Sequence, residues 1–226
     1  MKNGLFIIFE GGEGGGKSSV IRYLHDTLKN MFRDINLIIT REPGGSPYGE
    51  LMRKALFDID YQGKSVMAEL LTFCAGRADH CDNLIRPALQ SGKLILCDRF
   101  SPSTYAYQIC GRNLLHYEGV YSLVDSIARG KYHRDGEILP DLVIWLNIDP
   151  EIGRGRILKF RQEEITHFDQ ESADFHRRVH AGYSKLCNEN KNWDWIEVDA
   201  SQTLEWVKAR CLSIVCQIIC QRMEVN

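Results

Sequence analysis

Residues 11–18 form a glycine-rich segment that ends in Lys17 and Ser18. The segment reads Gly-Gly-Glu-Gly-Gly-Gly-Lys-Ser and fits the pattern G-x-x-x-x-G-K-S, which binds nucleotide phosphates where it joins a strand to a helix. Glycines let successive backbone N–H groups turn toward phosphate oxygens without a Cβ atom in the way. We expect Lys17 to reach the β- and γ-phosphates and the Ser18 hydroxyl to coordinate Mg²⁺.

A dinucleotide-binding G-x-G-x-x-G pattern does not fit this segment, because the sixth position counted from Gly12 is Lys17. The segment is therefore predicted to bind a nucleoside triphosphate. The predicted set is Gly11, Gly12, Glu13, Gly14, Gly15, Gly16, Lys17, Ser18 and Ser19.

A second pair of chemically capable residues, Asp98 and Arg99, follows the apolar run Leu94-Ile95-Leu96-Cys97. A carboxylate at the tip of a strand beside the glycine-rich segment can hold Mg²⁺ through water, and an adjacent arginine can bind a phosphate. The sequence has no Asn-Lys-x-Asp segment, with which GTPases read their base. The candidate classes are therefore ATP-using kinases, ATPases and motor-like domains.

Short apolar runs alternate with longer amphipathic stretches along the chain, and this pattern must position those residues. Helices are predicted over 18–32, within 65–89 and over 204–222, and strands over 5–9, 36–40, 94–97, 142–148 and 195–198. Continuous apolar strands separated by helices indicate an α/β fold with a parallel sheet covered on both faces. In such sheets ligands bind at the carboxyl ends of the strands, where both motifs fall.

Length and charge bound the class of protein. The chain has 226 residues, no internal repeat and no low-complexity linker, so we expect one domain over 1–226. Lys and Arg total 28 and Asp and Glu total 30, which gives a net charge of -2 and argues against a basic nucleic-acid coat and an acidic disordered tail. The basic residues comprise 17 Arg and only 11 Lys, and Arg is the better residue for gripping phosphate through paired hydrogen bonds.

The eight cysteines include no Cys-x-x-Cys pair, which argues against a structural zinc site. Cys97, Cys211, Cys216 and Cys220 fall in apolar stretches, and we expect them to be buried, reduced thiols. The apolar run after Met1 is too short for a signal peptide, and no run approaches the ~20 apolar residues that a membrane span needs. A cytoplasmic protein is therefore expected, with no membrane or nucleic-acid partner.

Several ordered segments together resemble the bacterial type of thymidylate kinase (dTMP kinase), over nearly the whole chain. They are 9–17, 41–45, 70–78, 98–100 through 106–108, 140–142 and 199–201. The resemblance implies a P-loop nucleoside monophosphate kinase fold with a five-stranded parallel sheet and helices on both faces. It also implies ATP, Mg²⁺ and dTMP as ligands, ADP and dTDP as products on the way to dTTP for DNA synthesis, and a homodimer.

The resemblance assigns an acceptor site for dTMP, and helical spacing supports part of it. Phe73 and Arg77 are four residues apart and share one helix face, where a ring can stack on a pyrimidine and a guanidinium can donate to a base carbonyl. Tyr107 resembles the family tyrosine beneath the sugar. The full predicted set is Glu42, Pro43, Arg53, Phe73, Arg77, Arg99, Thr104, Tyr107 and Gln108.

Catalysis is expected to need no side-chain base, because the attacking group is the anionic phosphate of dTMP itself. The resemblance implies a mobile lid over about 151–170 that carries arginines. The resemblance assigns Arg154 to ATP binding. It offers two candidates for the arginine that stabilises the transition state, Arg156 and Arg161, because His167 stands where the family often has an arginine. Lys17, Arg99 and Glu13, which matches an acidic position near the acceptor sugar and Mg²⁺, complete the predicted catalytic set.

Two other functions are weighed against this one. A kinase for another monophosphate, such as dUMP or CMP, would be favoured if Phe73, Arg77 and Gln108 lay outside the acceptor pocket. A nucleotide-dependent switch that transfers nothing is disfavoured by the intact Lys17 and Ser18 together with the Asp-Arg pair at 98–99.

Overall fold

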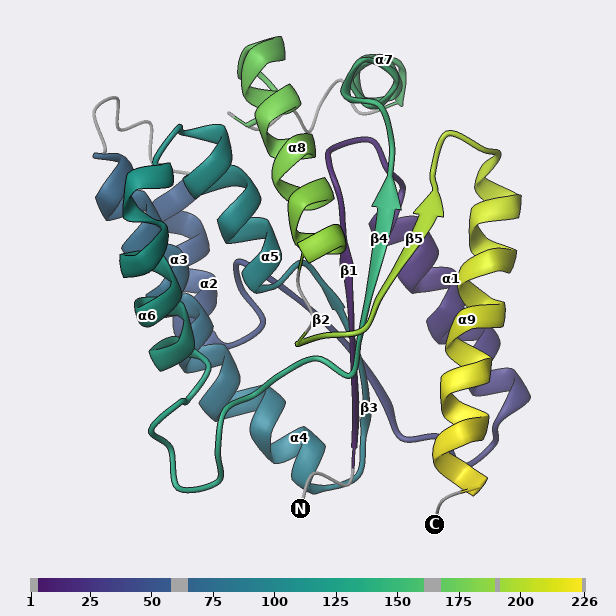
Figure 1. The fold of residues 1–226 in the computed structure, drawn as a ribbon. Helices are drawn as coiled ribbons and strands as arrows, with labels where there is room; N and C mark the ends of the chain where they lie inside the picture. The colour runs from purple at the N-terminus through teal and green to yellow at the C-terminus, as the bar shows by residue number, and fades with distance from the viewer. Residues whose placement is uncertain (1–3, 58–64, 161–167, 190–191, 225–226) are drawn as a thin grey trace.

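A five-stranded, all-parallel sheet organises the part of the chain that the computed structural model describes, residues 4–57, 65–160, 168–189 and 192–224. Its strands run in the order β2-β3-β1-β4-β5 (Figure 1). Their bounds are β1 (Leu5–Glu10), β2 (Leu37–Arg41), β3 (Leu94–Asp98), β4 (Leu142–Asn147) and β5 (Trp195–Asp199). The predicted α/β class and five parallel strands are confirmed, and no strand boundary differs from its predicted position by more than one residue.

Helices fill the connections between the strands, and a last helix follows β5. The helices are α1 (Lys17–Met31), α2 (Pro47–Phe57), α3 (Val66–His80), α4 (Arg86–Gln90), α5 (Ser101–Thr104), α6 (Glu118–Ala128), α7 (Pro150–Phe160), α8 (Ala173–Glu189) and α9 (Leu204–Glu224). Two π-helical stretches, Cys81–Ile85 and Tyr105–Gly111, and a 3₁₀ turn, Leu115–Tyr117, lie between them. The helical stretch expected within 65–89 is therefore α3 and α4 joined by a π-helical stretch. No helix in the described ranges is both long enough and apolar enough to cross a membrane.

Both faces of the sheet are covered, as the continuous apolar strands require. Leu5, Ile7 and Phe9 of β1 pack on one face with α1 and α9, whereas Phe6 and Ile8 pack on the other face with the Cys81–Ile85 stretch and α4. Figure 1 shows α1 and α9 on one side of the sheet and α3, α4 and α6 on the other. The alternation of neighbouring residues between two cores explains why β1 contains no polar residue before Glu10.

Burial of the cysteines agrees only in part with the expectation. Cys97 and Cys211 are buried, as predicted, and Cys216 is half-buried. Cys220 is exposed, so that prediction was wrong. Ile219 already occupies the core-facing position in this turn of α9, and the next residue lies about 100° around the helix.

The carboxyl ends of the parallel strands meet at one edge of the sheet and deliver the motifs there. β1 leads into the glycine-rich segment and then α1, β2 into the segment that begins at Glu42, and β3 into Arg99. Arg99 has a φ of 71°, a left-handed conformation that is uncommon for a residue with a Cβ atom. The Glu42–Pro43 peptide bond is cis.

Candidate active site

Lys17 is enclosed by the glycine-rich loop, residues 11–18, which leads into α1 and is called the phosphate loop below. Its Nζ donates to the carbonyl oxygens of Gly11 and Gly12 at 3.0 and 2.8 Å. Burial lowers the pKa of the Lys17 ammonium from its ordinary 10.5 to about 8, and the positive charge of Arg99 acts in the same direction. The loop therefore holds an ammonium group next to the positive end of the helix dipole, which together favour an anion.

The loop also contacts the first turn of α7 backbone to backbone. A Cβ atom on Gly14, whose φ is +73°, would lie 2.2 Å from the carbonyl oxygen of Gly153, and one on Gly153 would lie 2.3 Å from that of Glu13. Neither position has room for a side chain. The start of α7, where the predicted lid begins, is thus fixed directly against the phosphate loop.

Ser18 and Asp98 lie side by side where α1 begins and β3 ends. The Ser18 hydroxyl donates to Oδ2 of Asp98 at 2.8 Å. Hydroxyl and carboxylate oxygens are ligands that Mg²⁺ accepts, and both of these stand beside the loop that encloses Lys17. The pair therefore fits a magnesium ion shared with a bound nucleotide.

Arg99 uses both terminal nitrogens in contacts within the site. Nη2 donates to Oε1 of Glu13 at 2.6 Å and to the Tyr107 hydroxyl at 3.1 Å. Nη1 donates to the carbonyl oxygen of Gly11 at 3.0 Å and lies 3.1 Å from the hydroxyls of Ser103 and Tyr183. The guanidinium thus connects the phosphate loop to α5 and α8.

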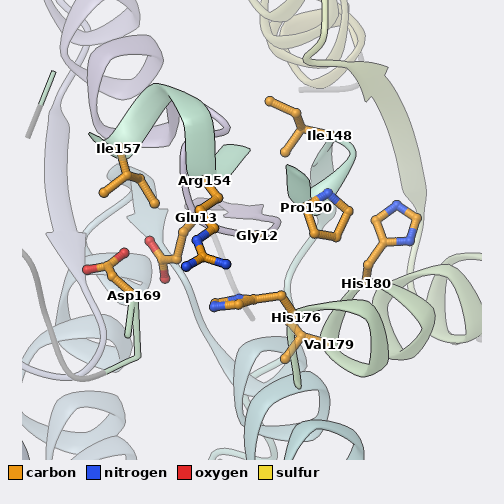
Figure 2. A pocket seen from close by; sticks show the side chains of 10 residues that line it. All are labelled: Gly12, Glu13, Ile148, Pro150, Arg154, Ile157, Asp169, His176, Val179 and His180. Atoms are coloured by element: carbon orange, nitrogen blue, oxygen red, sulfur yellow. The ribbon is translucent and has the colours of Figure 1, made fainter. Parts of the chain in front are cut away.

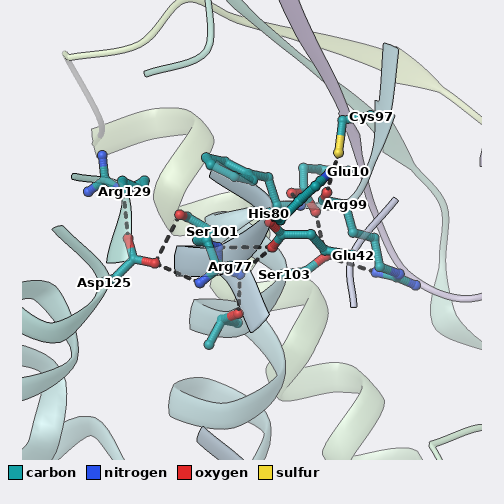
Figure 3. Close-up of polar contacts among 12 residues, drawn as sticks. Glu10, Glu42, Arg77, His80, Cys97, Arg99, Ser101, Ser103, Asp125 and Arg129 are labelled. Atoms are coloured by element: carbon teal, nitrogen blue, oxygen red, sulfur yellow. Dashed lines mark hydrogen bonds and ion pairs between the residues drawn. The ribbon is translucent and has the colours of Figure 1, made fainter. Parts of the chain in front are cut away.

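Arg77 is fully buried and its charge is balanced by two carboxylates (Figure 3). Nε donates to Oε2 of Glu42 at 2.9 Å and Nη1 to Oδ1 of Asp125 at 2.7 Å. Nη2 donates to the Thr104 hydroxyl at 2.7 Å. Residues predicted for one ligand on family grounds, Glu42, Arg77 and Thr104, are therefore joined in a single network.

Two further members of this network, Asp125 and His80, are not among the residues predicted from the sequence. Asp125 on α6 also accepts from Ser101 at 2.9 Å and from Arg129 at 2.8 Å. His80 is buried between Glu42 and Thr40, with ring nitrogens 3.0 and 2.7 Å from their side-chain oxygens. The four-residue spacing of Asp125 and Arg129 was a helical signal for an ion pair, but nothing local marked either residue as a partner of the site.

Aromatic rings form one wall beside this network. Phe73 and Tyr107 both contact Phe168, with ring centroids 6.4 and 5.6 Å apart. Gln108 lies close by and donates to the buried Glu69 at 3.0 Å. Phe168 falls in the predicted lid but is not among the predicted site residues.

One cleft gathers most of the predicted residues. Its lining includes Glu13, Gly14, Gly15, Gly16, Lys17, Ser18, Ser19, Glu42, Pro43, Arg53, Phe73, Arg77, Asp98, Arg99, Thr104, Tyr107, Gln108 and Arg156. Gly11 lies outside this lining and takes part through its carbonyl oxygen. Arg53 also lines the cleft, and its Nη1 donates to the carbonyl oxygen of Pro43 at 3.0 Å.

Arg154 and Gly12 line a smaller adjoining pocket, which shares Glu13 and Ile157 with the cleft. Figure 2 shows the side chains of Arg154, Glu13 and His176 turned toward the same space. Burial lowers the pKa of His176 below its ordinary value of 6.5. Arg154 itself is exposed, so its guanidinium can be reached from solvent.

Arg156 is tied to the loop after β5. Its Nη1 donates to the carbonyl oxygen of Ala200 at 2.7 Å, and its Nη2 donates to those of Ser201 and Gln202 at 3.0 and 3.3 Å. Nη1 also lies 3.5 Å from the carbonyl oxygen of Gly14. Arg161 and His167 fall outside the described residues.

A family model and the relatives of this chain carry the same description. Residues 9–211 match the family model described as thymidylate kinase. The thymidylate kinase of Desulfovibrio desulfuricans is 42% identical over 211 residues, covering 93% of this chain and 94% of that protein. That of Trichodesmium erythraeum is 37% identical over 227 residues, covering 95% and 96%.

A solved structure shares the fold. The crystal structure of thymidylate kinase from Ehrlichia chaffeensis superposes with a TM-score of 0.71, covering 94% of this chain and 98% of that one at 24% identity. Because the family model matches most of this chain and these relatives are 37% and 42% identical to it, the chain belongs to the thymidylate kinase family.

Proposed function

We propose that this protein transfers the γ-phosphoryl group of ATP to dTMP, forming ADP and dTDP. The observation that carries the proposal is that one cleft is lined both by the glycine-rich loop with Lys17 and Ser18 and by the acceptor residues that the family resemblance assigns. Membership of the thymidylate kinase family supports the same reaction.

The donor side is built from the loop and the start of α1. Backbone N–H groups of the loop and the Lys17 ammonium would bind the β- and γ-phosphates. Ser18 and Asp98 would hold Mg²⁺, which when bound neutralises charge on the phosphates. Arg156 lines the cleft and also fixes α7 to the loop 200–202, of which Gln202 lines the cleft as well.

The acceptor side is built from α3, α5 and the π-helical stretch after α5. Phe73 would stack on the thymine ring, while Arg77 and Gln108 would read its polar edge. Arg53 and Arg99 would hold the phosphate of dTMP. The buried carboxylates of Glu42 and Asp125 support Arg77 in its position, which makes a well-defined site for a planar base.

Transfer needs no side-chain base in this arrangement. An oxygen of the dTMP phosphate, already anionic near neutral pH, would attack the γ-phosphorus while the bond to the β–γ bridging oxygen breaks and ADP leaves. Lys17 and Arg99 would neutralise the charge that spreads over the transferred group. Glu13, paired with Arg99 at 2.6 Å, would orient that guanidinium beside the acceptor sugar.

We further propose that a lid over about 151–170 supplies the transition-state arginine. The candidates are Arg161, Arg156 and, because it is exposed beside Glu13, Arg154. Separate replacement of each by Ala should identify it, since loss of a true arginine finger lowers kcat by ~10³ or more. We expect Arg156→Ala to raise the KM for ATP as well, because its removal frees the loop 200–202. Three kcat values near that of the unmodified enzyme would contradict the lid assignment.

We propose that the protein forms a homodimer and is located in the cytoplasm. Val120, Leu123 and Ile127 expose about half of their side chains along one face of α6, at helical spacing, and Leu71 of α3 is exposed in a helix that packs against α6. A second copy of the chain would cover this apolar face. All eight cysteines are free thiols, which suits a reducing compartment.

The experiment that tests the function is a comparison of acceptors. ADP production from ATP is measured by a coupled assay with dTMP, dUMP, CMP or AMP as the second substrate. We expect the highest kcat/KM with dTMP. Preference for CMP or AMP would overturn the substrate assignment, and absence of turnover with every acceptor would support a nucleotide-dependent switch instead.

A further inference from the structure

The guanidinium of Arg99 has two differently situated edges. Its Nη2 edge meets Glu13 and Tyr107, which both line the cleft. Its Nη1 edge meets Gly11, Ser103 and Tyr183. Of these Nη1 partners, Ser103 also lines the cleft, whereas Tyr183 does not and its side chain is fully buried. Tyr183 therefore supports Arg99 from the side away from the cleft.

Glu10 orients the hydroxyl groups on that supporting edge. The Tyr183 hydroxyl donates to Oε2 of Glu10 at 3.1 Å, and the Ser103 hydroxyl donates to the same oxygen at 2.6 Å. Oε1 of Glu10 accepts from the backbone N–H of Phe100 at 2.7 Å. Because Oε2 of Glu10 accepts a hydrogen bond from each hydroxyl, both hydroxyl oxygens are left with lone pairs that can accept from Nη1 of Arg99. Figure 3 shows Glu10 and Ser103 grouped beside Arg99.

The packing of α8 keeps the Tyr183 hydroxyl in place. A Cβ atom on Gly182 would lie 3.1 Å from Cα of Ala106, so α8 approaches the π-helical stretch closely at this level. The Tyr183 ring is stacked on Trp145 of β4 with centroids 6.4 Å apart. Arg99 needs such support, since its left-handed backbone conformation is maintained only where the surroundings enforce it.

We propose that Tyr183, oriented by Glu10, is a positioning residue that holds the guanidinium of Arg99 toward the acceptor phosphate. The inference rests on the role proposed above for Arg99 in binding dTMP. Tyr183 lies on the helix that follows the lid, so it also links this helix to the arginine beside the phosphate loop.

A double-mutant cycle tests the inference. Tyr183→Phe removes the hydroxyl and keeps the ring, and we expect kcat/KM for dTMP to fall about tenfold, the effect of losing one hydrogen bond to a charged group. The KM for ATP should change by less than about twofold. In an Arg99→Ala background the same replacement should have no further effect, because Tyr183 acts through Arg99. Tyr105→Phe is the matched control, since it removes a hydroxyl that bonds Glu118 and Lys185 outside the cleft, and its kinetics should be unchanged.

The outcomes separate the two proposals. An unchanged kcat/KM in Arg99→Ala alone would overturn the proposed role of Arg99. A large loss in Arg99→Ala, combined with either no effect of Tyr183→Phe or the same fold loss in both backgrounds, would overturn the positioning role. If Tyr183→Phe does not fold, as judged by thermal unfolding, Glu10→Gln takes its place in the cycle with the same expectation of no further loss in the Arg99→Ala background.

Discussion

Glu10 is a fully buried carboxyl group at the end of β1. Burial raises its pKa from an ordinary 4.5 to about 7, although hydrogen bonds from Ser103 and the charge of Arg99 act against the rise. The folded protein therefore binds the proton more tightly than the unfolded chain does. Stability from this group is fully present below pH 4.5 and is lost as the pH rises through 7.

Replacement of Glu10 by Gln should remove this pH dependence. Between pH 4.5 and pH 8 the free energy of unfolding of the unmodified protein should fall by about 3 kcal/mol relative to Glu10→Gln. Denaturant unfolding at several pH values measures the difference, with Glu205→Gln on the exposed first turn of α9 as the control. If the difference in free energy of unfolding between the unmodified protein and Glu10→Gln stays constant with pH, the raised pKa of Glu10 is contradicted.

At this same scale, the juxtaposition of residues could be predicted where a local sequence pattern exists. Lys17, Ser18 and Asp98 were predicted to meet because they fall at the carboxyl ends of strands in a parallel sheet, and the structure brings Ser18 to 2.8 Å from Asp98. Asp125 and Tyr183 escaped prediction because their partners are 48 and 84 positions away in the chain, at Arg77 and Arg99. No spacing rule connects residues so distant until the fold is known.

At the scale of elements, the start of α7 depends on one glycine. Gly153→Ala would force its new Cβ atom to within 2.3 Å of the carbonyl oxygen of Glu13, so either the loop or the helix must move. We expect the KM for ATP to rise at least about tenfold, because the phosphate loop loses its geometry. Gly155→Ala, two residues along in the same helix, meets nothing within 4 Å and provides the matched control.

The control has a definite expectation of its own. Gly155→Ala should leave the kinetics unchanged and should stabilise the protein by up to about 1 kcal/mol, since Ala is the better helix former. Equal kinetics for Gly153→Ala and Gly155→Ala would show that the contact between α7 and the loop has no role in ATP binding.

Elements that follow simple periodicity were predictable, and those that break it were not. The first turns of α3 obey helical spacing, but the π-helical stretches Cys81–Ile85 and Tyr105–Gly111 add residues to a turn, which amphipathic patterns do not reveal. The second of these stretches matters for the site, because it carries both Tyr107 and Gln108. Their predicted positions came from family resemblance rather than from spacing.

At the scale of the whole molecule, the apolar face of α6 formed by Val120, Leu123 and Ile127 is the proposed homodimer interface. Leu123→Glu places a charge in the middle of that face and should shift a dimer to a monomer at micromolar concentration, measured by sedimentation velocity. Met31→Glu, an equally exposed apolar residue on α1, should leave the dimer intact. A monomeric unmodified protein, or a dimer that survives Leu123→Glu, would contradict the proposed interface.

The sheet itself was predictable from five apolar runs separated by helices, since continuous burial on both faces leaves a clear mark in the sequence. The strand order β2-β3-β1-β4-β5 was not, because it depends on how the connections cross in space. That order places β3 between β2 and β1, and so brings the segments after β1, β2 and β3 around one cleft.

Product analysis tests the central proposal most directly. The protein is incubated with ATP, Mg²⁺ and dTMP, and the nucleotides are separated and measured over time. We predict that ADP and dTDP form in equal amounts, and that Lys17→Ala abolishes both. ADP formation without dTDP, or dTDP formation that persists in Lys17→Ala, would contradict phosphoryl transfer from ATP to dTMP in this cleft.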